Sequence, residues 1–162
     1  MSDVPVAPAN DEECEIPVVI ADEEKIVRAV FNNHLERNRL RSNFFDHPQD
    51  QASVMRHSHM GTRECKRRAR NIKPGNPNLK YRGMAVIQAR AIRDAEGEVV
   101  DSREVYCGHA HVSVDVEMPP PGDPLESERK FQRDQRLRSL ARSARYIADP
   151  DPDDAEWTGD DI

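Results

Sequence analysis

One uninterrupted alternation of apolar and polar residues, from residue 105 to residue 118, constrains the fold more than any other stretch. Every second residue is small or apolar, and these are Tyr106, Gly108, Ala110, Val112, Val114, Val116 and Met118. The residues between them are Cys107, His109, His111, Ser113, Asp115 and Glu117. Because strand side chains alternate between two faces, this pattern predicts a β-strand with one buried face and one chemically capable polar face.

The remaining patterns predict short elements around this strand. An apolar stripe at Ile26, Val27, Val30 and Phe31 favours a helix that begins near Glu23. Further expected elements are an edge strand at 16–20, a strand at 52–59, a helix at 62–72, a central strand within 81–93, a short strand at 99–100 and a last helix at 125–148. Neighbouring strands joined by turns pair antiparallel, so we expect an α+β fold, a small and mainly antiparallel sheet with helices packed on one side.

Charge is distributed unevenly along the chain, although the formal net charge is only −6. Residues 1–24 and 149–162 together hold 15 of the 30 acidic residues and none of the 24 basic ones, so the part between them carries a formal charge of +9. This division predicts a disordered acidic tail at 1–15, a single basic α+β domain at 16–148 and a second disordered acidic tail at 149–162.

The three cysteines, Cys14, Cys65 and Cys107, are odd in number and form no CxxC pair, which predicts reduced thiols without a disulfide. No apolar run approaches the ~20 residues that span a bilayer. The first residues also lack the basic and apolar segments of a secretory signal. We therefore expect a cytoplasmic protein that does not contact a membrane.

The polar face of the expected strand suggests a metal site at Cys107, His109 and His111. Alternate strand residues lie roughly 7 Å apart on one face, and neutral imidazole and thiolate are good zinc ligands. No standard ligand spacing is present, and a solvent-facing strand is polar without any metal. We therefore expect no cofactor, with zinc as the alternative.

The same histidines suggest acid–base catalysis on a phosphodiester. His109, His111 and His57, next to arginine, could move a proton and stabilise the charge of a phosphorane. The triplet from His111 to Ser113 resembles the HxS/T element of two-histidine phosphoesterases. Those enzymes carry the element twice, and the triplet that begins at His57 does not match it, so the resemblance implies no activity by itself.

Two expected helices are rich in lysine and arginine, and the helix at 62–72 has one acidic residue against five basic ones. Such an imbalance favours an anionic partner, either nucleic acid or an acidic protein surface, over a merely solvated helical face. The residues that we expect to bind phosphates are Arg63, Lys66, Arg67, Arg70, Arg138, Arg142 and Arg145.

The segments ASVMR, YRGMAVIQARAIR and GHAHVSV resemble, in broad outline, small uncharacterised bacterial proteins that pair a short SV strand with a later strand containing HA and a hydrophobic residue. This resemblance implies a bacterial or phage origin and no particular activity. We expect a non-enzymatic binding module, a component of a larger bacterial assembly that binds nucleic acid or another polyanion through a basic face. The alternatives are a small phosphodiesterase or ribonuclease that uses the strand histidines, and a protein-binding adaptor whose acidic tails mimic nucleic acid.

Overall fold

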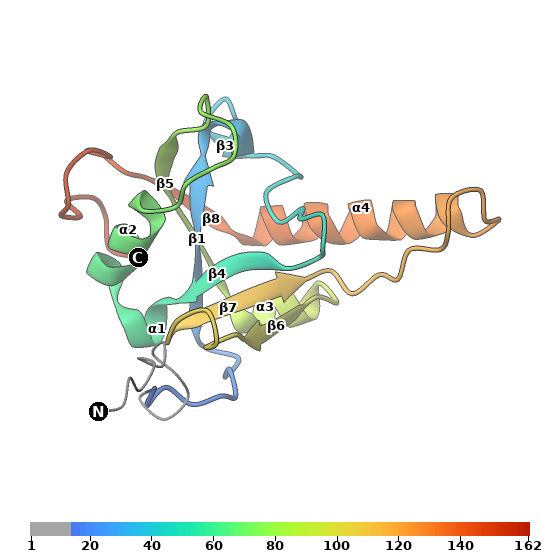
Figure 1. Ribbon diagram of the computed structural model, residues 1–162, viewed down its shortest axis with the longest axis horizontal. Coiled ribbons are helices and arrows are strands. Elements are labelled where there is room, and N and C mark those ends of the chain that lie inside the picture. Colours follow the sequence, from blue (N-terminus) through green and yellow to red (C-terminus); the bar gives the residue numbers. More distant parts are fainter. Residues whose placement is uncertain (1–13) are drawn as a thin grey trace, which may run out of the picture.

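The computed structural model describes residues 14–162 and contains a six-stranded antiparallel sheet (Figure 1). The strand order across the sheet is β6-β7-β4-β1-β5-β8. Its strands are β1 (Lys25–Phe31), β4 (Ala52–Arg56), β5 (Tyr81–Gln88), β6 (Glu98–Asp101), β7 (His109–Ser113) and β8 (Arg145–Ala148). The helices are α1 (His57–Met60), α2 (Thr62–Arg70), α3 (Ala89–Asp94) and α4 (Glu126–Ser143). A short 3-10 turn, η1 (Asn32–His34), leads into a separate hairpin of β2 (Leu35–Glu36) and β3 (Arg39–Leu40).

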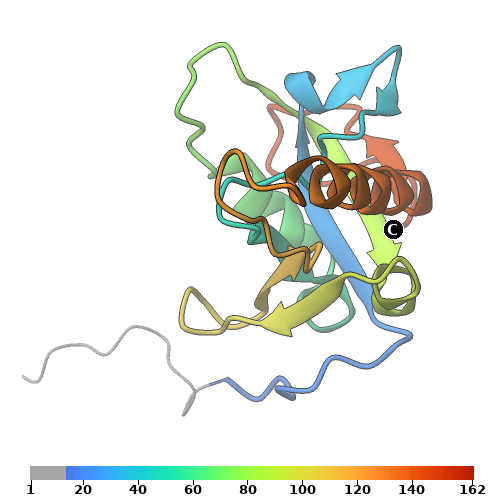
Figure 2. The same ribbon diagram turned by 90° about the vertical axis from the view of Figure 1, so that its right-hand side faces the viewer.

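The predicted α+β class with a mainly antiparallel sheet is confirmed. The sheet separates two hydrophobic cores, and helices lie on both of its faces and not on one. On one face, Ile26 and Val30 of β1 pack with Leu137 and Leu140 of α4. On the other face, Val27 of the same strand packs in one cluster with Cys65 and Ala69 of α2. We call these the α4 face and the α2 face; Figure 2 shows α3 and α4 on one side of the sheet and α2 on the other.

The prediction of a helix that begins near Glu23 is wrong, because this segment forms β1 at the centre of the sheet. Ile26 and Val27 are adjacent in sequence, point to opposite faces and are both fully buried. A central strand covered on both sides is apolar throughout and loses the alternation that identifies an edge strand. Its apolar positions therefore also fit a helical stripe.

The last helix is shorter than predicted, and the tail at 149–162 is not disordered. Helix α4 ends at Ser143, and the following residues form β8, which pairs with β5. Beyond β8 the chain packs against the α2 face, where Asp149 and Ile162 are both buried. Asp149 forms an ion pair with Lys66 of α2, whose side chain is fully enclosed. This buried pair explains why an acidic segment is held on the body of the protein.

The N-terminal segment is tied to the loop between β6 and β7. Residues 1–13 of the predicted acidic tail lie outside the described residues, but Cys14 is buried and forms a disulfide with Cys107. The prediction of reduced thiols is therefore wrong for these two residues, whereas Cys65 is free. The disulfide lies just before β7, so the strand expected at 105–118 begins only at His109. Strand β7 ends at Ser113, and its apolar face is confirmed because Ala110 and Val112 are buried in the core of the α4 face. On the polar face His109 is buried as well.

Candidate ligand-binding cleft

The two central strands β1 and β4 pair only at one end and then diverge. Ile26 lies opposite Arg56 and Val27 opposite Met55, and no further register pair joins these strands. Arg28 fills the space that opens between them. Its Nε donates to the carbonyl of Phe44 at 3.0 Å, and its Nη1 donates to the carbonyl of Ser53 at 2.7 Å. The arginine thus supplies a hydrogen bond to β4 where the β1–β4 ladder is missing, and a second one to the loop before β4.

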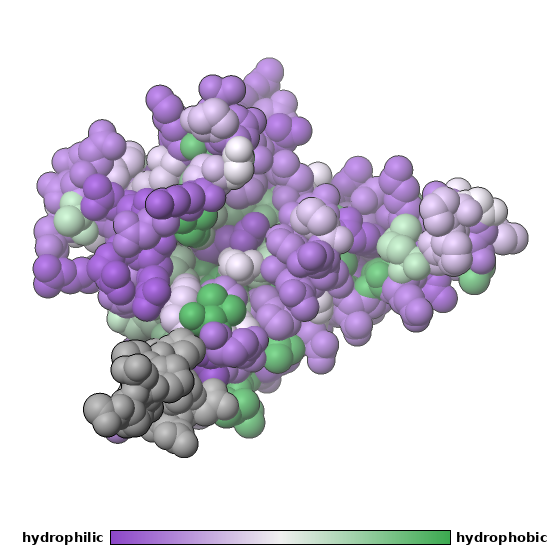
Figure 3. Space-filling view, viewed as in Figure 1, coloured by the Kyte–Doolittle hydropathy of each residue, from purple (hydrophilic) through white to green (hydrophobic). Residues whose placement is uncertain are grey.

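A cleft of about 900 Å³ lies where the strands separate, and we call it the β1–β4 cleft. Figure 3 shows apolar side chains gathered around a hollow near the middle of this face, with hydrophilic side chains at its rim. The apolar lining residues include Phe31, Val54, Met55, Ile72, Leu79 and Val105. Its polar lining includes Arg28, His34, His47, Arg68, Tyr106 and His109. A mostly apolar cavity of this size with a few convergent polar groups is typical of a ligand site.

The cleft is electrostatically one-sided. Two arginines and three histidines line it, and its lining within residues 14–162 contains no carboxylate. Arg68 forms an ion pair at 3.1 Å with Glu64, which lies outside the lining, so Arg28 is the arginine of the lining without a carboxylate partner in the described chain. Burial lowers the pKa of Arg28 to about 10, and the guanidinium remains charged at neutral pH. No Asp or Glu of the described chain lies within ion-pair distance of Arg28. The cleft therefore carries an uncompensated positive charge at its floor.

Two of the three cleft histidines, His34 and His109, have pKa values below the usual value and accept or donate hydrogen bonds within the protein. Burial, with the nearby charge of Arg28, lowers the pKa of His34 to about 4, and its Nδ1 accepts the backbone N–H of Phe31 at 3.1 Å. Burial, with the neighbouring His111, also lowers the pKa of His109. The Nδ1 of His109 lies 2.5 Å from the hydroxyl of Ser102. Neutral imidazoles can bind a ligand through Nε2 without adding charge.

Tyr106 and Arg68 form a stacked pair in the wall of the cleft. The guanidinium carbon of Arg68 lies 3.9 Å from the centre of the Tyr106 ring, and this ring meets His109 edge-on with centroids 5.0 Å apart. Arg68 comes from α2 and Tyr106 from the loop between β6 and β7, so the pair joins two walls of the cleft. Flat aromatic and guanidinium surfaces are suited to stacking against a planar ligand.

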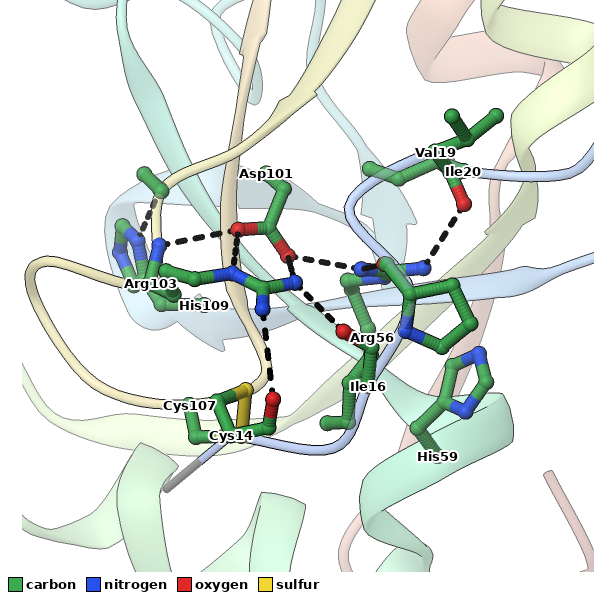
Figure 4. A network of polar contacts seen from close by, with 12 residues as sticks. Cys14, Ile16, Val19, Ile20, Arg56, His59, Asp101, Arg103, Cys107 and His109 are labelled. Carbon is green, nitrogen blue, oxygen red and sulfur yellow. Dashed lines mark hydrogen bonds and ion pairs between the residues drawn. A yellow bond between two sulfur atoms is a disulfide. The ribbon is translucent and has the colours of Figure 1, made fainter. Parts of the chain in front are cut away.

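A buried ionic network holds the loop that carries Tyr106 (Figure 4). Asp101 lies between two arginines, with its carboxylate 2.7 Å from Arg56 Nη1 and 2.8 Å from Arg103 Nε. Burial acts to raise the pKa of Asp101, but the hydrogen bonds from Arg103 and Arg56 outweigh it and keep the pKa below its usual value. Arg103 also donates to the carbonyl of Ile16 at 2.6 Å. Together with the Cys14–Cys107 disulfide, these contacts fix the N-terminal segment against the β6–β7 loop.

The three histidines proposed for catalysis do not form one group. His109 lines the cleft, and His111 follows it on the same side of β7. His57 lies at the start of α1, where its Nε2 is 2.8 Å from the hydroxyl of Thr62, and burial next to Lys25 lowers its pKa. The structure therefore brings His109 and His111 near each other and gives His57 a different environment.

The metal site proposed at Cys107, His109 and His111 is contradicted by the structure. The sulfur of Cys107 is bonded to Cys14 and cannot coordinate a metal as a thiolate. Across residues 14–162, no group of three or more His, Cys, Asp or Glu side chains is arranged to hold a metal ion.

The seven cations proposed for nucleic-acid binding do not form one basic face. Lys66 is fully buried with Asp149, so it is a structural residue and not part of a surface. Two of the others on α2 are exposed and paired, Arg63 with Glu156 and Arg67 with Glu64. The remaining ones are distributed over three places: Arg70 at the end of α2, Arg138 and Arg142 on α4 across the sheet, and Arg145 at the start of β8.

Sequence reasoning missed Arg28, His34, Arg68 and Tyr106 as site residues. The one available signal is Arg28, a lone charge in the middle of the apolar run KIVRAVF. A charge inside a central strand calls for an explanation, because burying it costs free energy unless it is paired.

The chain matches no protein-family model, no curated protein and no solved structure to which it was compared. The resemblance to small bacterial proteins therefore stays a prediction. Within the part of the chain that the structure describes, no helix has the length and apolar character needed to cross a bilayer.

Proposed function

We propose that this protein is a non-enzymatic binding module for nucleic acid and that it takes one nucleotide unit into the β1–β4 cleft. The observation that supports this most directly is Arg28, a half-buried guanidinium in the cleft without a carboxylate partner in the described chain. A cation in this position favours an anionic ligand, because the ligand supplies the missing counter-charge.

Two fully buried cations of the protein, Arg56 and Lys66, have carboxylate partners, and Arg28 differs from them in having none in the described chain. Arg56 is fully buried and forms ion pairs with Glu24 at 2.8 Å and with Asp101 at 2.7 Å. Lys66 is fully buried and forms an ion pair with Asp149 at 3.0 Å. Both are compensated from within the chain, as a stable fold requires. Arg28 is left to a partner from outside.

The walls of the cleft favour a ligand that is planar and apolar as well as anionic. Ile72 and Val105 line the cleft and leave 44% and 59% of their surface exposed, which is unusual for large apolar side chains beside a cavity. Tyr106 and Arg68 offer stacked flat surfaces in the same wall. A nucleotide combines a planar base with a phosphate, and its base would contact these residues while its phosphate approaches Arg28.

Binding suits these residues better than turnover does. Catalysis by two histidines needs an acid and a base on either side of the reacting phosphate. His109 has its Nδ1 engaged by the hydroxyl of Ser102 and a lowered pKa, and His57 is hydrogen-bonded to Thr62 outside the cleft lining.

The test is equilibrium binding of a fluorescently labelled oligothymidylate, followed by fluorescence anisotropy at fixed salt. Arg28→Gln should weaken binding at least about tenfold, because a hydrogen bond to a charged group contributes about 1.5–3 kcal/mol. Arg142→Gln is the matched control, since it removes an exposed arginine from α4 and should change affinity less than about twofold.

A thermal melt of each variant separates lost binding from lost folding, and Arg68→Gln gives a second reading of the same cleft. If Arg28→Gln and Arg68→Gln both fold and bind like the unmodified protein, the cleft is not the binding site. Gel analysis of the incubated oligonucleotide, together with oligouridylate, also reports hydrolysis. Cleavage that disappears in His109→Ala would replace the binding proposal with the ribonuclease alternative.

A further inference from the structure

A second hollow of about 910 Å³ adjoins the β1–β4 cleft, and we call it the β5–β8 hollow. The two share Phe31, Ile72, Pro74 and Leu79 in their lining, so they lie on either side of the same loop between α2 and β5. The second hollow is lined in addition by two tyrosines and three cations, which are Tyr81, Tyr146, Arg70, Lys80 and Arg82. It therefore repeats the combination of aromatic and cationic groups found in the first.

The β5–β8 hollow is also positively charged on balance. Lys80 and Arg82 are exposed, and neither has a carboxylate within ion-pair distance in the described part of the chain. Of the two acidic residues in its lining, Asp149 is neutralised by the buried Lys66 and also accepts the hydroxyl of Tyr81 at 2.8 Å. Asp153 accepts a hydrogen bond from Arg70 through its backbone carbonyl, so the arginine stays at the hollow.

We infer that the ligand is a single strand of nucleic acid that continues from the β1–β4 cleft into the β5–β8 hollow. This inference rests on the proposed function, because it needs one nucleotide in the first cleft. The strand crosses the shared wall at Phe31 and Leu79, and the next base enters the second hollow. The phosphates of that second unit contact Lys80 and Arg82.

Recessed aromatic side chains select a single strand over a duplex. Two hollows flanking one loop accept bases only when these are unstacked and turned away from a partner strand. A cationic path with aromatic side chains for successive bases is the arrangement by which proteins bind single strands with little sequence preference. Base pairing would keep the bases stacked inside a helix and leave only phosphates for the protein to contact.

The experiment compares thymidine 5′-monophosphate with 5′-phosphorylated oligothymidylates of two, four and eight nucleotides, by calorimetry and by anisotropy competition. The affinity for the two- or four-nucleotide strand should be at least about tenfold higher than that for the mononucleotide, because further phosphate contacts form. The variant Lys80→Glu/Arg82→Glu should lose this rise and bind the mononucleotide as before. Its salt dependence for the eight-nucleotide strand should be flatter by about 1.4 in slope, since each phosphate contact on a single strand contributes about 0.7.

Arg138→Glu/Arg142→Glu is the control with the same change in charge, placed on α4 and outside the lining of both hollows. It should keep the length dependence if the path is local, and a loss equal to that of Lys80→Glu/Arg82→Glu would overturn the inference. Mononucleotide binding that depends on Arg28, without any gain from length, would also overturn it while the proposed function stands. Absence of binding to mononucleotide and to every oligonucleotide would remove both. A hairpin duplex that binds as tightly as the single strand would exclude the strand selection.

Discussion

Replacing Lys66 by methionine should strongly destabilise the protein, although this residue belongs to a helix that reads as a basic surface. Its side chain is 0% exposed, and its ammonium group lies 3.0 Å from a carboxylate oxygen of Asp149, which is also 0% exposed. It further donates to the carbonyls of Asp151 and Glu156. Lys66→Met leaves a buried carboxylate without its cation, and breaking such a pair costs about 3–5 kcal/mol.

The expected loss lies near the lower end of this range, because Asp149 keeps two other donors. The hydroxyl of Tyr81 and the backbone N–H of Asp151 still donate to its carboxylate, at 2.8 and 2.9 Å. For a chain of this size each kcal/mol corresponds to about 2–4 °C in melting temperature, so the variant should melt roughly 10 °C lower. Urea denaturation gives the free energy of unfolding, and limited proteolysis reports whether residues 149–162 have become accessible.

Two variants serve as controls for this experiment. Arg67→Met removes an exposed neighbour that pairs with Glu64, and its melting temperature should stay unchanged. Lys66→Met/Asp149→Leu removes both charges and should recover only part of the loss, because the hydroxyl of Tyr81 and the N–H of Asp151 then lack their acceptor. If Lys66→Met melts like the unmodified protein and protease sensitivity is also unchanged, Lys66 does not anchor the segment. The packing of residues 149–162 would then need another explanation.

Two further changes test other parts of the fold. Cys14→Ser/Cys107→Ser removes a link between residues 93 positions apart and should lower the free energy of unfolding by about 2–4 kcal/mol in urea titrations. The disulfide would be contradicted if this free energy is unchanged in the variant, or if reductant does not change it in the unmodified protein. The pKa of His34 falls to about 4 in the folded state, so its contribution to stability is complete above pH 6.5 and declines as pH falls from 6.5 towards 4, by up to about 3 kcal/mol. His34→Gln should remove this part of the decline. The reasoning would be refuted if the free energy of unfolding falls equally in the two proteins between about pH 7 and pH 4.5.

Much of the sheet could be predicted because several strands have strong local patterns. The alternation around Val112 identifies β7 and its buried face, and the apolar run around Met84 indicates a central strand. Strand β1 was not predicted because a hydrophobic core covers each of its faces, so its apolar residues do not alternate with polar ones. Strand β8 was not predicted because Ile147 continues the apolar stripe of α4 in the sequence. Only the pairing of this segment with β5 ends the helix.

The candidate site was less predictable, because it depends on contacts between distant residues. The disulfide joins positions 93 apart, and the pair of Lys66 with Asp149 spans 83 residues. A local window contains no information on either partner, so Lys66 reads as one more surface cation and Cys107 as a free thiol. The cleft itself arises where β1 and β4 diverge, a property of strand register that no single segment carries.

The charge of Arg28 is the feature of this fold that folding alone explains least. Arg28 provides two N–H donors, one for the carbonyl of Phe44 and one for the carbonyl of Ser53. A neutral side-chain amide could also provide two donors. Burial lowers the pKa of Arg28 from 12.5 to about 10, which corresponds to a cost of roughly 3 kcal/mol for holding the charged form. A hydrogen bond from this guanidinium to a phosphate would return a comparable free energy, about 1.5–3 kcal/mol. The hydrogen bonds to the two carbonyls and the Phe44 ring, 5.5 Å from the guanidinium carbon, offset part of this cost, and a phosphate would offset more of it because it also supplies the counter-charge.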